Sequence, residues 1–219
     1  MSLFSRIRDL AVSFLFPKNK KILALEALSA KELRNTLPKA EQVKNKNTFA
    51  LFDYAHPLVK EMIWELKYGG NRQIALKFGE ILFEHIEHEL LEKAVFEKGS
   101  RPLLVPVPVS DKRRFERGWN QSELLAEEII KFDRKKFLKY LPRQLVKTHH
   151  TESQTQTSSR TERLKNITHS MKVLNPSSVA GECLILIDDV TTTGSTFAEA
   201  ERTLRSAGAK EIFCLALAH

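Results

Sequence analysis

The residues best suited to chemistry lie in the last quarter of the chain. Two adjacent carboxylates, Asp188 and Asp189, follow a short apolar run, and a turn rich in hydroxyl groups comes directly after them. Carboxylates can accept hydrogen bonds from the vicinal hydroxyls of a sugar and can hold hydrated Mg²⁺. The turn precedes a helix, where backbone N–H groups and the helix dipole favour a phosphate. A diol beside a phosphate indicates a ribose 5-phosphate.

The turn itself consists of Thr192, Thr193, Gly194, Ser195 and Thr196. Gly194 allows a ligand to approach the backbone closely. Each half of the pattern has a simpler explanation, since two acids can end a strand and a Thr-Gly-Ser-Thr sequence can cap a helix. Their combination favours a binding site. A P-loop NTPase and a dinucleotide-binding protein are both excluded, because the chain has neither a Gly-x4-Gly-Lys loop nor a Gly-x-Gly-x-x-Gly loop.

The elements that must position these residues follow an α/β pattern. The apolar run 183–187 predicts a strand buried on both faces. A helix that ends at Gly208 follows the turn, and residues 212–218 predict another strand. Such a β-loop-α-β unit has a right-handed crossover. We therefore predict an α/β fold, in which helices flank a parallel β-sheet.

A related pattern lies upstream. The proline-bounded run 102–108 predicts a strand, the charged segment 111–114 a loop, and the apolar period of 120–132 a helix. Helices are also expected over 57–66 and from Ile74 to about residue 93. The basic loop thus follows a strand of the same predicted sheet.

The composition excludes several classes of protein. The 219 residues leave room for one full domain and a small appendage, and 42% of them are hydrophobic. No apolar run approaches the roughly 18 residues of a membrane span. The two cysteines, Cys183 and Cys214, exclude a disulfide framework and a four-thiolate zinc site, and they favour a reducing cytoplasm. Both lie in predicted apolar strands, where we expect them to be buried.

The positive charge is concentrated in the middle of the chain. Lys and Arg exceed Asp and Glu by 35 − 27 = 8 overall, and residues 101–147 alone contribute 12 − 6 = 6. This concentration attracts phosphate, nucleic acid or acidic lipid, although a solvated basic helix face gives the same pattern. Residues 148–159 contain no aliphatic or aromatic side chain, which predicts either disorder or a lid over a functional site.

The N-terminal region differs in composition from the rest. An apolar helical face predicts a helix that packs on the core or a partner, or lies on a membrane surface; it comprises Leu3, Ile7, Leu10 and Phe14. Residues 18–50 are rich in lysine and predict a loosely structured connector or small subdomain. We therefore divide the chain into a mainly helical N-terminal region, 1–50, and a main domain, 51–219.

Three segments together resemble one known family. Residues 185–196 resemble the phosphoribosyl pyrophosphate (PRPP) motif of type I phosphoribosyltransferases. Residues 105–124, with Arg117-Gly118-Trp119-Asn120-Gln121, and the Leu66-Lys67-Tyr68-Gly69-Gly70 segment are similar to the competence protein F (ComF) family, as is the region from Lys147 to Asn166. The resemblance covers roughly residues 52–218 and implies the type I phosphoribosyltransferase fold.

The resemblance also implies an activity and a set of roles. It implies a glycosyltransferase that binds PRPP with Mg²⁺, transfers phosphoribosyl to a nucleobase-like acceptor and releases pyrophosphate. Asp188 and Asp189 would contact the ribose hydroxyls and Mg²⁺, directly or through water, and the turn 192–196 would wrap the 5-phosphate. The basic residues divide between two jobs: Lys112, Arg113 and Arg117 for pyrophosphate, and Lys147, Arg160 and Arg163 for a mobile loop over the site.

The chain also departs from the family. Relatives begin with a four-cysteine zinc module after a Phe-Pro pair, whereas Phe16-Pro17 here leads into lysines and no cysteine precedes Cys183, so we expect no zinc site. The family name supports an alternative function, a non-enzymatic accessory of DNA uptake that binds single-stranded DNA or the competence machinery. The basic cluster 131–139, which includes Phe132 and Phe137, would then track the strand.

Overall fold

The computed structural model describes residues 20–41, 47–88, 101–148 and 170–219. In these residues the central sheet has five strands, all parallel, in the order β1-β7-β6-β2-β3. The strands are β1 (Thr48–Phe52), β2 (Leu103–Pro106), β3 (Lys139–Tyr140), β6 (Cys183–Val190) and β7 (Glu211–Ala218). The predicted parallel sheet is therefore confirmed.

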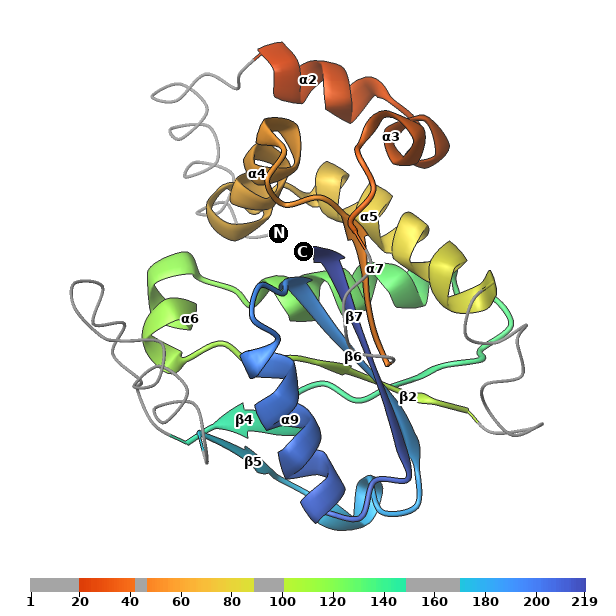
Figure 1. The fold of residues 1–219 in the computed structure, drawn as a ribbon, viewed down its shortest axis with the longest axis vertical. Helices are drawn as coiled ribbons and strands as arrows, with labels where there is room; N and C mark the ends of the chain where they lie inside the picture. Colours follow the sequence, from red (N-terminus) through yellow and green to blue (C-terminus); the bar gives the residue numbers. More distant parts are fainter. Residues whose placement is uncertain (1–19, 42–46, 89–100, 149–169) are drawn as a thin grey trace, which may run out of the picture.

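Helices cover both faces of this sheet (Figure 1). One face carries α2 (Lys20–Ala27), α3 (Ala30–Thr36), α4 (Pro57–Trp64), α5 (Arg72–His85) and α7 (Gln121–Phe132). The other face carries α9 (Ser195–Ser206) and a small antiparallel sheet of β4 (Leu145–Lys147) and β5 (Met171–Val173). The α9 helix, its flanking strands and α7 match the elements that the sequence predicts.

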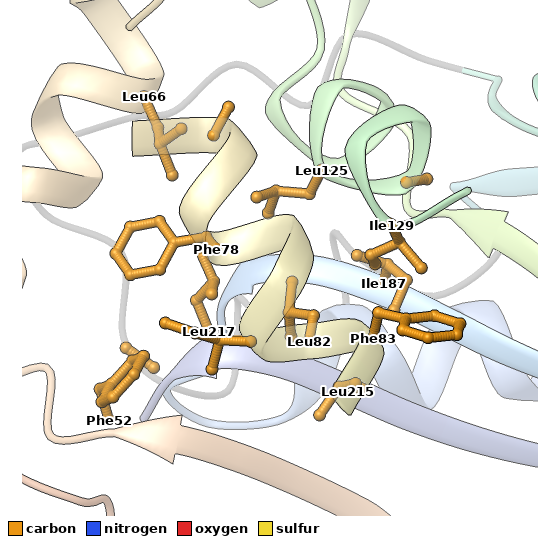
Figure 2. Packing of buried hydrophobic residues seen from close by; sticks show 14 of the residues in the cluster. Phe52, Leu66, Phe78, Leu82, Phe83, Leu125, Ile129, Ile187, Leu215 and Leu217 are labelled. Carbon is orange, nitrogen blue, oxygen red and sulfur yellow. The ribbon is translucent and has the colours of Figure 1, made fainter. Parts of the chain in front are cut away.

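The core is split by the sheet into two layers. Because successive strand residues point to opposite faces, Ile185 and Ile187 of β6 belong to the core under α5 and α7, which also contains Phe78. Figure 2 shows part of this core, including Ile187 and Phe78. Leu184 and Leu186 point the other way and pack under α9. The apolar run of β6 is thus buried on both sides, which fixes the carboxyl end of the strand, where the two acids lie.

Residues 20–41 are more ordered than the loose connector that their lysine content predicts. A capping box joins Ser29 and Glu32 at the start of α3, and the apolar side chains of α2 and α3 enter the core that contains Phe78. These side chains are Ile22, Leu25, Leu33 and Leu37. The boundary that we placed at residue 50 falls inside β1, which pairs with β7 at the edge of the sheet.

The segment 111–114, predicted as a loop, is part of a helix, α6 (Asp111–Arg117). The Ser110 hydroxyl accepts a hydrogen bond from the Arg113 N–H at 3.3 Å and caps the first turn. Gly118 ends the helix with a φ of 83°. Sequence reasoning missed this helix because none of its side chains is buried, which leaves no apolar period.

Both cysteines are buried, as predicted. Within the described ranges, no helix is long and apolar enough to cross a membrane. Three predictions concern parts of the chain outside those ranges: the helix around Leu3 to Phe14, the polar stretch beyond Thr148, and the roles of Arg160 and Arg163.

Candidate functional site

The acid pair lies at the carboxyl end of the central strand of the sheet. In the parallel pairing of β2 with β6, Pro106, the last residue of β2, lies opposite Ile187, the residue before Asp188 in β6. The chain leaving β2 leads within a few residues to Ser110 and α6. Ligands of parallel α/β sheets bind at this carboxyl edge. The predicted sugar site and the predicted pyrophosphate segment are therefore neighbours in space.

Asp188 is held by two hydrogen bonds to one of its oxygens. The Ser122 hydroxyl donates to Oδ1 at 2.9 Å, and the backbone N–H of Asp189 donates to the same atom at 2.9 Å. Burial and the negative charge of Asp189 raise the pKa of Asp188 to about 7, against the effect of these two hydrogen bonds and of Lys67. The carboxyl is oriented for a ligand and is costly to ionise without a cation.

Asp189 faces a lysine from the opposite side of the site. Lys67 Nζ lies 3.0 Å from Asp189 Oδ2, and the side chains are 21% and 10% exposed. Among the described residues, no donor of good hydrogen-bond geometry reaches the buried Oδ2, whose charge is balanced by the Lys67 ammonium. Such an orphaned oxygen is unfavourable by itself and marks a place for a ligand or ion.

The hydroxyl turn leads directly into α9. Gly194 is its N-cap residue, with a φ of 73°, and it contributes no side chain to cap the helix. The Thr193 and Ser195 hydroxyls lie 2.9 Å apart, next to the first amides of the helix. Amide donors at the start of a 12-residue helix and two adjacent hydroxyls are groups that can bind an anion such as a phosphate.

A clamp of three contacts holds the segment that carries Lys67. This segment is a π-helical turn, η1 (Glu65–Gly69), between α4 and α5. The Trp119 indole N–H donates to the Leu66 carbonyl at 2.9 Å, and the Gln121 amide donates to the Lys67 carbonyl at 3.4 Å. The third contact is between Tyr68 and Arg117, whose guanidinium lies 5.0 Å from the ring centroid.

The clamp explains why the two signature segments of the sequence go together. Gly70 follows η1 with a φ of 56°, and a Cβ there would come within 2.9 Å of the Trp119 ring. The side chain of Asn120 bonds the Val107 carbonyl at 3.0 Å and caps α7 through the Ser122 N–H. These residues therefore fix Lys67 and Ser122, which touch the two acids.

The predicted basic residues are divided between the site and its rim. Lys147 ends β4, and burial together with the nearby Arg113 lowers its pKa, while Asp188 acts in the opposite direction. Lys147, Arg113 and Asp188 are therefore close enough to interact. Lys112 is exposed on α6. Arg117 is already bonded to Gln121 at 2.9 Å, in the clamp.

The donor set fits Mg²⁺. Two adjacent carboxylates, one with an orphaned oxygen, provide the hard oxygen ligands that Mg²⁺ prefers. In the described part of the chain, no group of three or more His, Cys, Asp or Glu residues is placed for a metal. Such a site fits an ion that keeps several waters and takes its other ligands from a phosphate substrate.

Sequence reasoning gave no individual role to Lys67 or Ser122, although both lie in segments that it singled out. A lysine beside a Gly-Gly break and a serine at the start of a helix are common, so neither carries a signal alone. Their roles arise from contacts with Asp188 and Asp189, which are more than 60 residues away in the sequence.

Curated proteins similar to this chain include several linked by name to DNA use. No family model matches the chain. The DNA utilization protein YhgH of Escherichia coli is 32% identical over 165 residues, which cover 74% of this chain and 68% of that protein. Competence protein F of Haemophilus influenzae is 32% identical over 109 residues, or 50% of this chain and 46% of that protein. The chain belongs to the ComF family.

Another ComF relative and two solved structures extend the comparison. Competence protein ComFC of Bacillus subtilis is 34% identical over 69% of this chain and 55% of its own length. Hypoxanthine phosphoribosyltransferase of Trypanosoma cruzi is similar with a TM-score of 0.40 and 10% identity, over 66% of this chain and 64% of that one. The glutamine PRPP amidotransferase of B. subtilis is similar with a TM-score of 0.41 and 16% identity. The match covers 70% of this chain and 30% of the amidotransferase chain. Similarity at this level says nothing of the reaction.

Proposed function

We propose that this ComF protein binds PRPP with Mg²⁺ at the carboxyl end of β6 and transfers its phosphoribosyl group to a nucleobase-like acceptor. One observation carries the proposal. The acid pair, the hydroxyl turn at the start of α9 and the cations of α6 and β4 surround one edge of the sheet. Diol, 5-phosphate and pyrophosphate are the three polar parts of PRPP, and each has a matching group here.

The residues have distinct tasks in this reaction. Asp188 and Asp189 accept hydrogen bonds from the ribose hydroxyls, and the turn 192–196 donates to the 5-phosphate. The bond from ribose C1 to a pyrophosphate oxygen breaks, a bond from C1 to an acceptor nitrogen forms, and the acceptor loses its proton. Mg²⁺ would supply neutralising charge to the pyrophosphate.

The cations around the leaving group complete the proposal. Arg113 and Lys112 of α6 and Lys147 of β4 stabilise the negative charge of pyrophosphate as it departs. Arg117 would join them only by leaving Tyr68 and Gln121, which it contacts in the structure.

The test is PRPP-dependent release of pyrophosphate, screened over nucleobases and small amines with Mg²⁺ present. We expect release with at least one nucleobase and a loss of at least about 100-fold in rate when both acids are changed to Asn. Release at the wild-type rate by that double variant would refute the proposed site, and no release with any acceptor would refute the transferase.

A second function, binding of single-stranded DNA, is favoured by one observation on α6. Phe115 is 92% exposed on a helix that also carries Lys112, Arg113 and Arg117. An exposed ring among cations suits base stacking with phosphate contact. The cluster 131–139 suits it less, since Phe132 and Phe137 pack against the core and Lys131 pairs with Glu128.

An oligonucleotide titration tests this second function. At low salt we expect Phe115→Ala to weaken binding by about fivefold or more, because stacking on one ring contributes about 1 kcal/mol or more. Asp188→Asn should leave the affinity unchanged. No binding at low salt would exclude this function.

A further inference from the structure

The ammonium of Lys67 has no task in the proposed reaction, although it lies inside the site. Its Nζ is 3.0 Å from Asp189 Oδ2, and both side chains are largely buried. Since Oδ2 accepts no hydrogen bond, Lys67 is the compensating charge for this oxygen among the described residues. A metal ion that binds this oxygen would therefore compete with the ammonium.

The backbone of Lys67 is fixed while its side chain can move. Trp119 and Gln121 bond the carbonyls of Leu66 and Lys67, and Gly70 lies against the Trp119 ring. A lysine side chain has four rotatable carbons and three donors that accept many arrangements. Lys67 can thus exchange one anionic partner for another without a change in the fold.

Lys67 should affect the binding of a metal ion alone and the binding of a metal ion with a polyanion in different ways. Mg²⁺ alone must displace the largely buried ammonium from Asp189 and places a second positive charge beside it, which is unfavourable. A polyanion that arrives with the metal offers the ammonium a phosphate oxygen in place of the carboxylate. Lys67 therefore opposes the binding of Mg²⁺ alone and favours the joint binding of Mg²⁺ and a polyanion.

We propose that Lys67 is a built-in counter-ion that couples metal binding to polyanion binding. It neutralises Asp189 before any ligand binds and passes to a phosphate oxygen when Mg²⁺ and pyrophosphate or PRPP bind together. The inference rests on the proposed function for the identity of the polyanion, but its competition with the metal requires no catalysis. Coupling of this kind is reciprocal, so pyrophosphate should tighten the metal as much as the metal tightens pyrophosphate.

The experiment compares Lys67→Met with wild type, with Mn²⁺ as a spin probe for the metal site. Bound Mn²⁺ is measured by electron paramagnetic resonance, with and without pyrophosphate. We expect Lys67→Met to bind Mn²⁺ alone about tenfold more tightly and to lose most of the tightening by pyrophosphate, about tenfold. Lys60→Met removes an exposed lysine of α4, 5.9 Å from the Tyr54 ring centroid, and should behave as wild type.

Equal Mn²⁺ affinity in Lys67→Met and wild type, or an unchanged effect of pyrophosphate, would overturn the proposal. If circular dichroism shows that the Met variant is unfolded, Lys67→Gln takes its place, because its amide is polar but carries no charge, and the same expectations hold. A PRPP titration of wild type separates the two claims. No PRPP binding would refute the proposed function, whereas tighter Mn²⁺ binding by the variant would still support the counter-ion.

Discussion

Two regions meet at the acid pair, and they are built in different ways. The strand, turn and helix from β6 to α9 are continuous in the chain, so neighbours in sequence are neighbours in the site. The clamp around η1 joins residues that lie 53 and 54 positions apart. The groups that would face the ligand therefore come from one continuous stretch of chain, whereas the ammonium of Lys67, which balances the charge of Asp189, is positioned by tertiary contacts.

The two regions also differ in how tightly they are packed. Gly194 in the turn has a φ of 73°, and no atom lies within 4 Å of the place that a Cβ would take, as expected where a ligand approaches. Gly70 in the clamp has a similar φ but lies against Trp119. Changes in the turn should therefore affect binding first, and changes in the clamp should affect stability first.

The largest effect should come from Asp189→Asn, which removes the charge where the two regions meet. The variant loses one proposed Mg²⁺ ligand and the carboxylate that pairs with the largely buried Lys67. We expect PRPP affinity, measured by calorimetry with Mg²⁺, to fall at least about 100-fold, or about 2.7 kcal/mol. Glu182→Gln, at an exposed acid before β6, should bind as wild type. Equal PRPP affinities of Asp189→Asn and Glu182→Gln would contradict the role proposed for Asp189.

A pair of glycine substitutions compares packing in the clamp with open space. Gly70→Ala places a methyl group 2.9 Å from Trp119 at a φ of 56°, whereas Gly118→Ala has a φ of 83° and nothing within 4 Å. The left-handed backbone alone costs about 1–2 kcal/mol. In urea unfolding we expect Gly118→Ala to lose about 1 kcal/mol and Gly70→Ala about 2.5 kcal/mol. Equal losses would mean that Trp119 moves aside and the clamp is loose.

The pH dependence of stability and of Mg²⁺ affinity tests the raised pKa of Asp188. Because the pKa of Asp188 is raised to about 7, the folded protein holds a proton that the unfolded chain has lost between about pH 4 and pH 7. The stability of the metal-free protein should therefore fall as the pH rises through this window. Mg²⁺ needs the ionised carboxyl, so its affinity should be about tenfold lower at pH 6 than at pH 8. Asp188→Asn should remove this pH dependence. If the pH dependence persists in the variant, another group causes it.

The smallest effect should come from Trp119→Phe. An aromatic ring is kept at position 119, but the variant loses the outer indole atoms that lie against Gly70 and the 2.9 Å bond from the indole N–H to the Leu66 carbonyl. We expect a loss of about 1 kcal/mol in the free energy of unfolding, measured in urea. PRPP affinity should change less than threefold, about 0.6 kcal/mol. A large loss of affinity with unchanged stability would place Trp119 in the binding site itself.

The sequence predicted the local region well, because its signals are local. The aliphatic run 183–187, the break at Gly194 and the helix stop at Gly208 each act within a few residues. The phosphate-binding role that we propose for the turn rests on the same short segment. The parallel sheet followed too, since a strand buried on both faces requires helices on both sides.

The clamp was beyond such reasoning for a physical reason. The indole N–H of Trp119 and the amide of Gln121 have no preferred partner in sequence, and the fold alone brings η1 to them. The helix α6 was missed because it buries nothing and is held by the cap at Ser110. The sequence around Lys67 does not distinguish it from a surface lysine, because its contact with Asp189 arises only in the folded chain.

The most direct test of the account is a calorimetric titration of wild type with PRPP, once with Mg²⁺ and once with a chelator. We predict one binding site with Mg²⁺, at least about tenfold weaker binding without it, and no measurable binding by the variant with both Asp188 and Asp189 changed to Asn. Absence of PRPP binding by wild type, or binding that survives in that variant, would contradict the account.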